Sequence, residues 1–579
     1  MPSIRAMIPS QEARESIGLP NRWDVLVMPL VLALLFLAAW AMRQMSAPYS
    51  WGSPIAISLD PAYLPYYALR TTLRMVLAMA CSLLFTFVYG SAAARSARAA
   101  VILIPLLDIL QSVPILGFLS ITVVGFIRLF KGSLLGPEAA AIFAIFTSQA
   151  WNMAFSFYNS LRMLPKNLYQ VADVFHLSAW ARFWKLEVPF AMPGLVWNTM
   201  MSASGGWFFV VASEAISVSG KTVMLPGVGS YIALAIQGRN LTAIGYAIVA
   251  MLVVIVLYDQ LLFRPLIAWS DKFKFELSES EAVPNSIVLQ ALQRARFLRK
   301  LRAWLAAALL RWRPRRPRGW AERLGHPFRR ATASGDRVWS STVLVLSGVS
   351  LFALGHYIAH AVPVAEIGRV FLLGLATAAR VFILIVLASL VWVPVGVWIG
   401  LRPRWTQKAQ PIVLFLSAFP ANLLFPLAVV AITTYHLNTE VWLSPLMILG
   451  TQWYILFNVI SGAAAIPNDL KEAAANLGLR RLMVWRRLIL PAIFPAYVTG
   501  GLTASGGAWN ASVVSEIVSW GPTRLTATGL GAYIAQQTAA GDDARIALGI
   551  CVMSLYVVII NRLVWNKLYR FAQSRLTLE

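Results

Sequence analysis

One polar stretch between two long apolar segments decides the fold: Glu472-Ala473-Ala474-Ala475-Asn476-Leu477-Gly478, which runs on to Ile489-Leu490-Pro491. A loop that only joins two membrane helices needs a few residues, whereas this loop is long, polar and basic. A weaker copy, from Gln170 to Pro189, lies about three hundred residues earlier. The pair indicates a duplicated membrane protein with two loops that something outside the membrane holds.

The composition is that of a membrane protein. Of 579 residues, 59% are hydrophobic and 13% are charged, whereas a soluble domain carries about 25% charged residues. The apolar residues come in runs of roughly 20, long enough to cross a bilayer. The net charge of +25 fits basic cytoplasmic loops near anionic lipids rather than binding of nucleic acid.

The hydropathy pattern predicts an all-α integral membrane protein with about 12 transmembrane helices, six in each half. The expected spans of the first half are 25–42, 68–94, 100–127, 138–160, 190–213 and 243–264. Those of the second half are 339–360, 366–400, 410–434, 442–465, 490–515 and 545–565. Most short basic loops fall on one side with both termini, which predicts a cytoplasmic location for them, and Arg128 and Lys131 are the exceptions.

Four segments follow from these spans: a cytoplasmic N-terminal segment 1–24, a first repeat 25–270, a basic cytoplasmic linker 271–337 and a second repeat 338–579. Within the linker, Ala291 to Arg313 has the pattern of an amphipathic helix on the inner leaflet. A solvated tether that follows the positive-inside bias explains the same charges equally well.

An internal repeat relates the two halves. At an offset of 306, one set of positions matches: Thr71, Arg74, Gly90, Pro105 and Pro114 with Thr377, Arg380, Gly396, Pro411 and Pro420. At an offset of 302, a second set matches: Trp151, Pro165, Ala172, Leu177, Pro189, Gly227 and Gly229 with Trp453, Pro467, Ala474, Leu479, Pro491, Gly529 and Gly531. An even number of spans gives both copies the same topology, so the repeat is parallel and its halves enclose a path between them.

The second loop has the signals of a helix, a turn and a second helix. Pro467, Asp469 and Glu472 suit a helix start. Gly478 can adopt a left-handed conformation and end that helix, and Pro491 begins the next span.

The pattern Glu472-Ala473-Ala474, Gly478 and Leu488-Ile489-Leu490-Pro491 resembles the cytoplasmic signature of permease subunits of bacterial ABC importers. It has one fewer residue before Ile489 than the loosest form of that signature allows. The chain resembles two such permeases fused, each half with the type I importer fold. The elements Ser213-Glu214 with Leu225 to Tyr231, and Ser515-Glu516 with Gly529 to Tyr533, look like the nitrate, sulfonate, taurine and bicarbonate branch.

The resemblance implies partners. Two cytoplasmic ATPase subunits, which carry ATP and Mg²⁺, would dock on the two loops, and an extracytoplasmic binding protein would deliver a small anion such as nitrate, sulfonate or bicarbonate. This chain would lie in a bacterial inner membrane, would bind no cofactor and would contact membrane lipids. The residues expected to couple it to the ATPases are Gln170, Ala172, Asp173, His176, Pro189, Glu472, Ala473, Ala474, Gly478 and Pro491.

The first loop departs from the signature, because Gln170, Val171 and His176 replace Glu, Ala and Gly, and Glu187-Val188 replaces Ile-Leu. One interpretation is an asymmetric transporter with a looser first contact. The other is drift in a contact that needs only a helix of that shape.

Glu214 and Glu516 occupy equivalent positions near the outer end of the fifth span of each half. A carboxylate at membrane depth faces a protein interior or an aqueous cavity. These residues either belong to the path or form structural ion pairs with Arg74 and Arg380. The other residues expected along the path are Trp207, Trp509, Asn510, Arg74 and Arg380.

Several apparent sites are rejected. Ser219-Gly220-Lys221-Thr222 resembles the end of a phosphate-binding loop but lacks its earlier glycine. His356 and His360 have no acidic or cysteine neighbour for a metal, and no nucleophile and base stand together. The sequence therefore predicts no enzyme and no metal site. The alternative to an ABC permease is a secondary transporter or channel driven by an ion gradient.

Overall fold

A computed structural model describes residues 22–50, 53–218, 221–273, 287–295, 304 and 333–575. Most of the predicted linker and N-terminal segment lie outside these residues, including most of the proposed amphipathic helix, although α12 (Ile287–Arg294) is helical. The boundaries of the four segments stay predictions.

The first half is a bundle of helices. Its elements are α1 (Arg22–Met45), α2 (Leu64–Arg95), α3 (Ala97–Ser112), α4 (Ile115–Leu129), α5 (Leu135–Met163), α6 (Lys166–Val174), α7 (Ala179–Arg182), α8 (Val188–Glu214), α9 (Val228–Gln237), α10 (Leu241–Tyr258) and α11 (Arg264–Ser270). The short strands β1 (Ala215–Val218) and β2 (Lys221–Met224) form an antiparallel hairpin in which Ala215 pairs with Met224.

The second half repeats this order. Its elements are α15 (Ala333–Ala361), α16 (Val364–Gly400), α17 (Pro403–Ala418), α18 (Phe425–Thr434), α19 (Thr439–Trp442), α20 (Gln452–Ala464), α21 (Asn468–Asn476), α22 (Arg481–Val484), α23 (Leu490–Ser515), α24 (Leu530–Ala540), α25 (Asp543–Ile560) and α26 (Asn566–Arg575). The hairpin of β3 (Ile517–Trp520) and β4 (Thr523–Thr526) lies at the position of the first hairpin. The predicted duplication of a helical membrane protein is confirmed, and the two hairpins are small additions to it.

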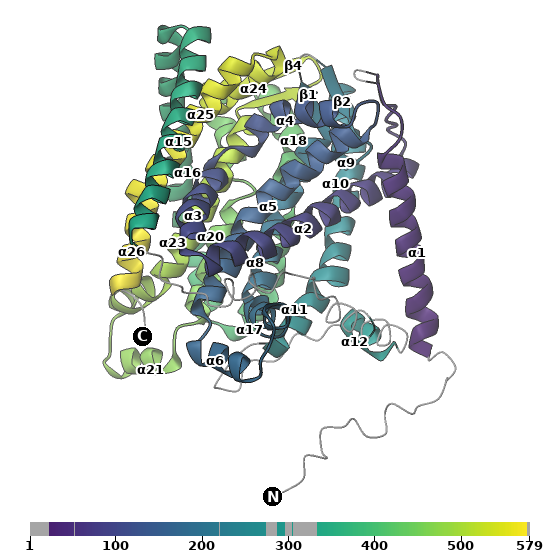
Figure 1. Cartoon of the computed structure of the whole chain (residues 1–579). Helices are drawn as coiled ribbons and strands as arrows, with labels where there is room; N and C mark the ends of the chain where they lie inside the picture. The colour runs from purple at the N-terminus through teal and green to yellow at the C-terminus, as the bar shows by residue number, and fades with distance from the viewer. Residues whose placement is uncertain are drawn as a thin grey trace, which may run out of the picture.

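Seven helices among the described residues are long and apolar enough to cross a membrane, or nine if each of two bent pairs is one span. The expected spans 138–160 and 190–213 fall on α5 and α8, which are 29 and 27 residues long. The two small elements α6 and α21 project from one end of the bundle, and the hairpins lie at the other end (Figure 1). Helices α1 and α15 flank the bundle on opposite sides in the same view.

Three spans that the sequence predicts as continuous are broken instead. Span 442–465 bends by 45° between Thr439–Met447 and Gln452–Ala464, and the other two break at a proline. Span 100–127 divides into α3 and α4 at Pro114, and span 410–434 bends by 72° at Pro420. The residue before each proline, Val113 or Phe419, has an extended backbone, because a following proline disfavours the helical conformation.

The two halves share their cores. Ile115, Leu116 and Val123 of α4 pack in the cluster that is built mainly from the second half. Conversely, Phe425 and Val429 of α18 pack in the cluster of the first half. Each half therefore buries a helix from the other, and the spans that break at a proline are the elements that cross between them.

Candidate functional site

The two loops singled out by the sequence form matching helical elements at one end of the molecule. Helices α6 and α21 are each nine residues long and project from the same end of the bundle (Figure 1). Each buries one alanine, Ala172 or Ala474. The other expected coupling residues on these loops are exposed: Gln170, Asp173, His176, Glu472, Ala473 and Gly478.

Both helices end in the same left-handed turn. Gly478 has φ +61° and His176 has φ +48°. In each turn an amide donates to the carbonyl five residues earlier, Leu479 to Ala474 at 3.2 Å and Leu177 to Ala172 at 3.0 Å. The first loop thus keeps the backbone conformation that glycine favours, although the Cβ of His176 makes this conformation sterically less favourable.

Apolar side chains accompany the exposed polar ones. Val174 and Phe175 of the first loop, and Leu477 and Leu482 of the second, are all more than 70% exposed. Isolated surface residues of this size need no explanation, but Phe175 and Leu477 occupy equivalent positions directly after α6 and α21. Exposed apolar residues repeated in this way are typical of a protein-binding surface.

After each loop the chain makes a π-helical turn, Phe183–Glu187 or Trp485–Ile489, and then enters the next long helix. Pro189 and Pro491 lie in the first turn of α8 and α23. A proline there lacks the amide that would continue a regular helix from the preceding residues, which favours the wider turn. Beside the first turn, burial and then the carboxylate of Glu187 raise the pKa of Tyr169 to about 12.

At the opposite end, Glu214 is the centre of a buried network. Its carboxylate accepts hydrogen bonds from Arg74 Nη1 at 2.6 Å, Thr71 Oγ1 at 2.7 Å and the Gly229 amide at 2.6 Å. Arg74 also binds Glu138, at 2.6 Å through Nε. The side chains of Arg74, Glu138 and Glu214 are fully buried, with 0% exposure.

Glu516 is held in the same way in the second half. Thr377 Oγ1 donates to it at 2.8 Å, the Ala532 amide at 3.1 Å and Arg380 Nη1 at 3.3 Å. Arg380 also binds Glu440. This network is more open, because the side chains of Arg380 and Glu440 are 15% and 45% exposed.

Sequence reasoning found the arginines and the two central glutamates but missed Glu138 and Glu440. The repeat could have found them, since these acids are themselves separated by 302 residues. A second cation, Arg70, binds Glu138 at 2.5 Å in the first half. Its counterpart at an offset of 306 is Ala376, which accounts for the smaller network of the second half.

The repeated glycines allow the backbone to approach these acids closely. A Cβ on Gly227 would lie 2.3 Å from the Glu214 carboxyl carbon, and one on Gly529 would lie 2.2 Å from Glu516 Oε1. A Cβ on Gly229 would lie 2.3 Å from the carbonyl oxygen of Val211. The loop after each hairpin can therefore wrap around its carboxylate only where these positions carry no side chain.

A cavity of about 230 Å³ lies between the halves. Pairs of residues related by the repeat line it: Gln111 and Ser417, Ile115 and Ala421, Ser148 and Gly450, Asn152 and Tyr454, Ser204 and Gly506, Phe208 and Asn510. The described lining contains polar amides, hydroxyls and aromatic rings but no charged side chain. The cavity therefore straddles the axis of the repeat.

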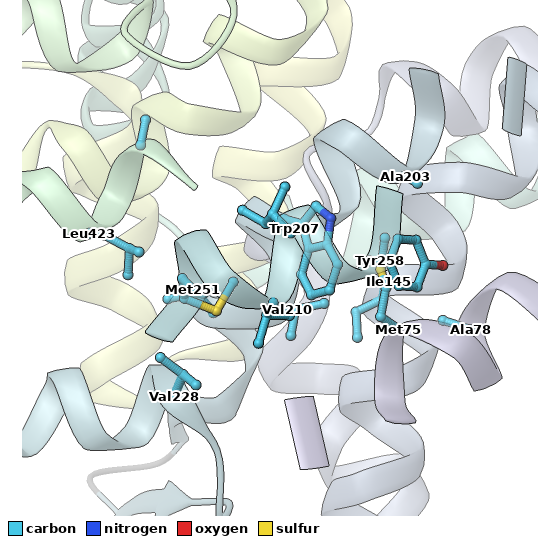
Figure 2. Close-up of a cluster of buried hydrophobic side chains, with 14 of the residues drawn as sticks. Met75, Ala78, Ile145, Ala203, Trp207, Val210, Val228, Met251, Tyr258 and Leu423 are labelled. Carbon is cyan, nitrogen blue, oxygen red and sulfur yellow. The ribbon is translucent and has the colours of Figure 1, made fainter. Parts of the chain in front are cut away.

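Of the seven residues expected along the path, Asn510 lines this cavity and the other six do not. Asn510 Oδ1 accepts a hydrogen bond from the Ile115 amide at 2.8 Å, across the interface of the halves. Trp207 packs in the hydrophobic core with its ring centroid 5.2 Å from that of Tyr258 (Figure 2), and Trp509 is buried beside Tyr556. The arginines are engaged by the glutamates and lie outside this cavity lining, and their place along the path stays a prediction.

The rejected motifs adopt other roles. Lys221 and Thr222 belong to β2 rather than to a loop before a helix. Among the described residues, no group of three or more His, Cys, Asp or Glu side chains could hold a metal ion. His356 and His360 stack on each other with ring centroids 4.0 Å apart.

Comparisons with known proteins agree with the duplication. The family described as "Binding-protein-dependent transport system inner membrane component" matches residues 82–264 and again 392–565, which together make up more than half of the chain. The chain is 26% identical over 189 residues to the nitrate import permease protein NrtB of Leptolyngbya laminosa, a match that covers 33% of this chain and 64% of that protein.

Two further relatives have related functions. The bicarbonate transport system permease protein CmpB of Synechococcus elongatus is 28% identical over 23% of this chain and 47% of its own length. The taurine transport system permease protein TauC of Escherichia coli is 25% identical over 25% of this chain and 51% of its own length. The chain thus spans between about half and just under two thirds of the length of these relatives.

The duplicated helical bundle and its long apolar helices are those of a multi-pass inner membrane protein. The chain belongs to the family of binding-protein-dependent transport system inner membrane components, with one family domain in each half.

Proposed function

We propose that this chain is the whole membrane-spanning part of an ABC importer, with both permease halves on one polypeptide. The observation that carries the proposal is the pair of equivalent exposed helices, α6 and α21, at one end of a duplicated bundle that encloses a cavity. Two cytoplasmic ATPase subunits dock on these helices, and they bind the ATP and Mg²⁺ that the chain itself does not bind. An extracytoplasmic binding protein delivers the solute to the end that carries the hairpins, and both termini are cytoplasmic.

The solute is a small anion. Support comes from the names of the relatives, which transport nitrate, bicarbonate and taurine. A lining of neutral amides and hydroxyls can donate hydrogen bonds to an anion without the tight binding that a fixed cation would give. Weak binding suits a path that must release the solute to the other side.

The test is reconstitution. The purified chain is placed in liposomes with its ATPase subunits and binding protein, and ATP hydrolysis is measured with nitrate, bicarbonate and taurine in turn. We expect ATP hydrolysis to rise when binding protein loaded with one of these solutes is added outside. Uptake along an ion gradient without any ATPase would support a secondary transporter or channel and overturn the proposal.

Glu516→Gln separates the roles of the buried glutamates. If Glu516 is structural, the variant loses stability while the affinity for the anion is unchanged in the protein that remains folded. A change in the choice between anions would assign Glu516 to the path.

A further inference from the structure

A chain of charged side chains links the first projecting helix to the end of α2. Asp173 Oδ1 of α6 lies 3.5 Å from Arg182 Nη1 of α7, and Arg182 Nε lies 3.7 Å from Glu187 Oε1. Glu187 Oε2 in turn lies 2.5 Å from Nη2 of Arg95, the last residue of α2. The route runs from an exposed surface into the base of the bundle.

The inner part of this chain is shielded from water. The side chains of Glu187 and Arg182 are 2% and 6% exposed, and that of Arg95 is 20% exposed. Aromatic rings cover both arginines: Arg182 lies over the Tyr169 ring at 5.6 Å and Arg95 over the Phe183 ring at 5.7 Å. Because the two pairs of Glu187 are shielded, they attract more strongly than surface pairs and are costly to separate. The outer pair is weaker, because Asp173 is 58% exposed.

The second half has the same fold at this place but the opposite chemistry. The positions equivalent to Arg95, Asp173, Arg182 and Glu187 carry Leu401, Ala475, Val484 and Ile489. Ile489 is buried in the hydrophobic cluster of that half, and Leu401 and Val484 pack against it. One joint is therefore made of directional ion pairs and the other of aliphatic side chains.

The two kinds of contact respond differently to movement. An ion pair that is also a short hydrogen bond, as between Arg95 and Glu187 at 2.5 Å, has one favoured geometry. Apolar contact is non-directional and depends on buried area. A helix joined by ion pairs is held in register, and one joined by aliphatic contact can slide with little penalty.

We infer that Arg95, Arg182 and Glu187 are positioning residues that hold α6 in register with α2, so that the first docking site is rigid and the second is pliant. This inference rests on the proposed docking of ATPase subunits at α6 and α21. It gives a physical reason for the departure of the first loop from the family signature. In the first half, ion pairs take the place of the apolar contacts that connect α21 to the bundle in the second half.

The test uses the equivalent exposed positions Gln170 and Glu472, which report on the two docking sites separately. In the full complex with Cys81 and Cys551 replaced by serine, Gln170→Cys or Glu472→Cys is cross-linked to the ATPase subunits with a short thiol-to-amine reagent. Glu187→Gln should reduce the cross-linking rate from position 170 by about tenfold and leave the rate from 472 within about twofold. A general loss of folding would lower both rates.

Two further variants complete the design. A fourfold variant gives the first half the residues found at the equivalent positions of the second half. Its substitutions are Arg95→Leu, Asp173→Ala, Arg182→Val and Glu187→Ile. We expect it to recover the cross-linking rate from position 170 to within about threefold of the parent, since no buried charge is left unpaired. Arg264→Leu, which removes an exposed ion pair with Asp259, is the control and should change neither rate.

The outcomes separate the two proposals. Absence of cross-linking from both positions in the parent complex would overturn the proposed function and this inference with it. Cross-linking from both positions in the parent, with an equal effect or no effect of Glu187→Gln on the two rates, would overturn the inference alone. A fourfold variant that is no better than Glu187→Gln would also overturn it.

Discussion

The two glutamate networks give a matched pair of substitutions, Arg74→Met and Arg380→Met, whose effects on stability should differ. Arg74 has no exposed side-chain surface and binds Glu138 at 2.6 Å, Glu214 at 2.6 Å and the Pro226 carbonyl at 3.0 Å. Its removal leaves the buried carboxylate of Glu214 without a cation. Breaking a buried pair in this way costs about 3–5 kcal/mol.

Arg380 should matter less. Its partner Glu440 is 45% exposed and its bond to Glu516 is 3.3 Å long, so water can replace part of what is lost. We expect a loss of about 1.5–3 kcal/mol, the usual contribution of hydrogen bonds to a charged group. For a unit the size of one half, the falls in Tm are roughly 6–20 °C for Arg74→Met and roughly 3–12 °C for Arg380→Met.

The assay is thermal unfolding of the purified protein in one detergent, followed by intrinsic fluorescence and by loss of soluble protein. Arg264→Met, at a surface ion pair, is the control and should change Tm by less than about 2 °C. The double variant Arg74→Met with Glu214→Gln should recover part of the loss, because the unpaired charge is gone. An effect of Arg380→Met as large as that of Arg74→Met would refute the argument from burial.

Three further predictions concern the backbone. His176→Gly should raise the free energy of unfolding by about 1 kcal/mol, seen as a higher Tm, because glycine adopts the left-handed turn at φ +48° without a steric penalty; a lower Tm would contradict this. Gly478→Val should lower anion-stimulated ATP hydrolysis about tenfold at normal expression. A Cβ at this position would meet no atom within 4 Å, so the variant disturbs only the backbone conformation of the left-handed turn. Unchanged uptake would count against coupling through this loop. Gly229→Ala should destabilise by about 1–3 kcal/mol in thermal unfolding, because its Cβ would overlap the Val211 carbonyl; a neutral result would mean that the loop moves freely away from Glu214.

Much of the architecture could be predicted because the sequence contains an internal repeat, so each half supports the interpretation of the other. The matches at offsets of 306 and 302 located both halves, and Gly478 predicted the left-handed turn that is observed. The pairing of Glu214 with Arg74 and of Glu516 with Arg380 was one of two interpretations, and both pairs form. Charges at membrane depth have few partners to choose from, so their pairing is a strong inference.

Other features depend on tertiary packing that periodicity does not record. Pro114 and Pro420 were visible as repeat markers, but an apolar run looks the same whether the helix bends at a proline or not. Trp509 is the direct neighbour of Asn510 on α23, yet the helix turns Trp509 into the core while Asn510 lines the cavity. The route from Asp173 to Arg95 joins residues about eighty positions apart, which no local pattern could reveal.

The exchange of helices between the two cores has a consequence for how such a path can open. Ile115 of α4 is at once a core residue of the far half, a wall of the cavity and the donor to Asn510. A wall built in this way cannot swing with its own half alone, since its interior contacts belong to the other. Opening of the cavity must therefore move packed side chains in both hydrophobic cores at once. Passage of any solute between the halves would then depend on a movement that the two halves make together.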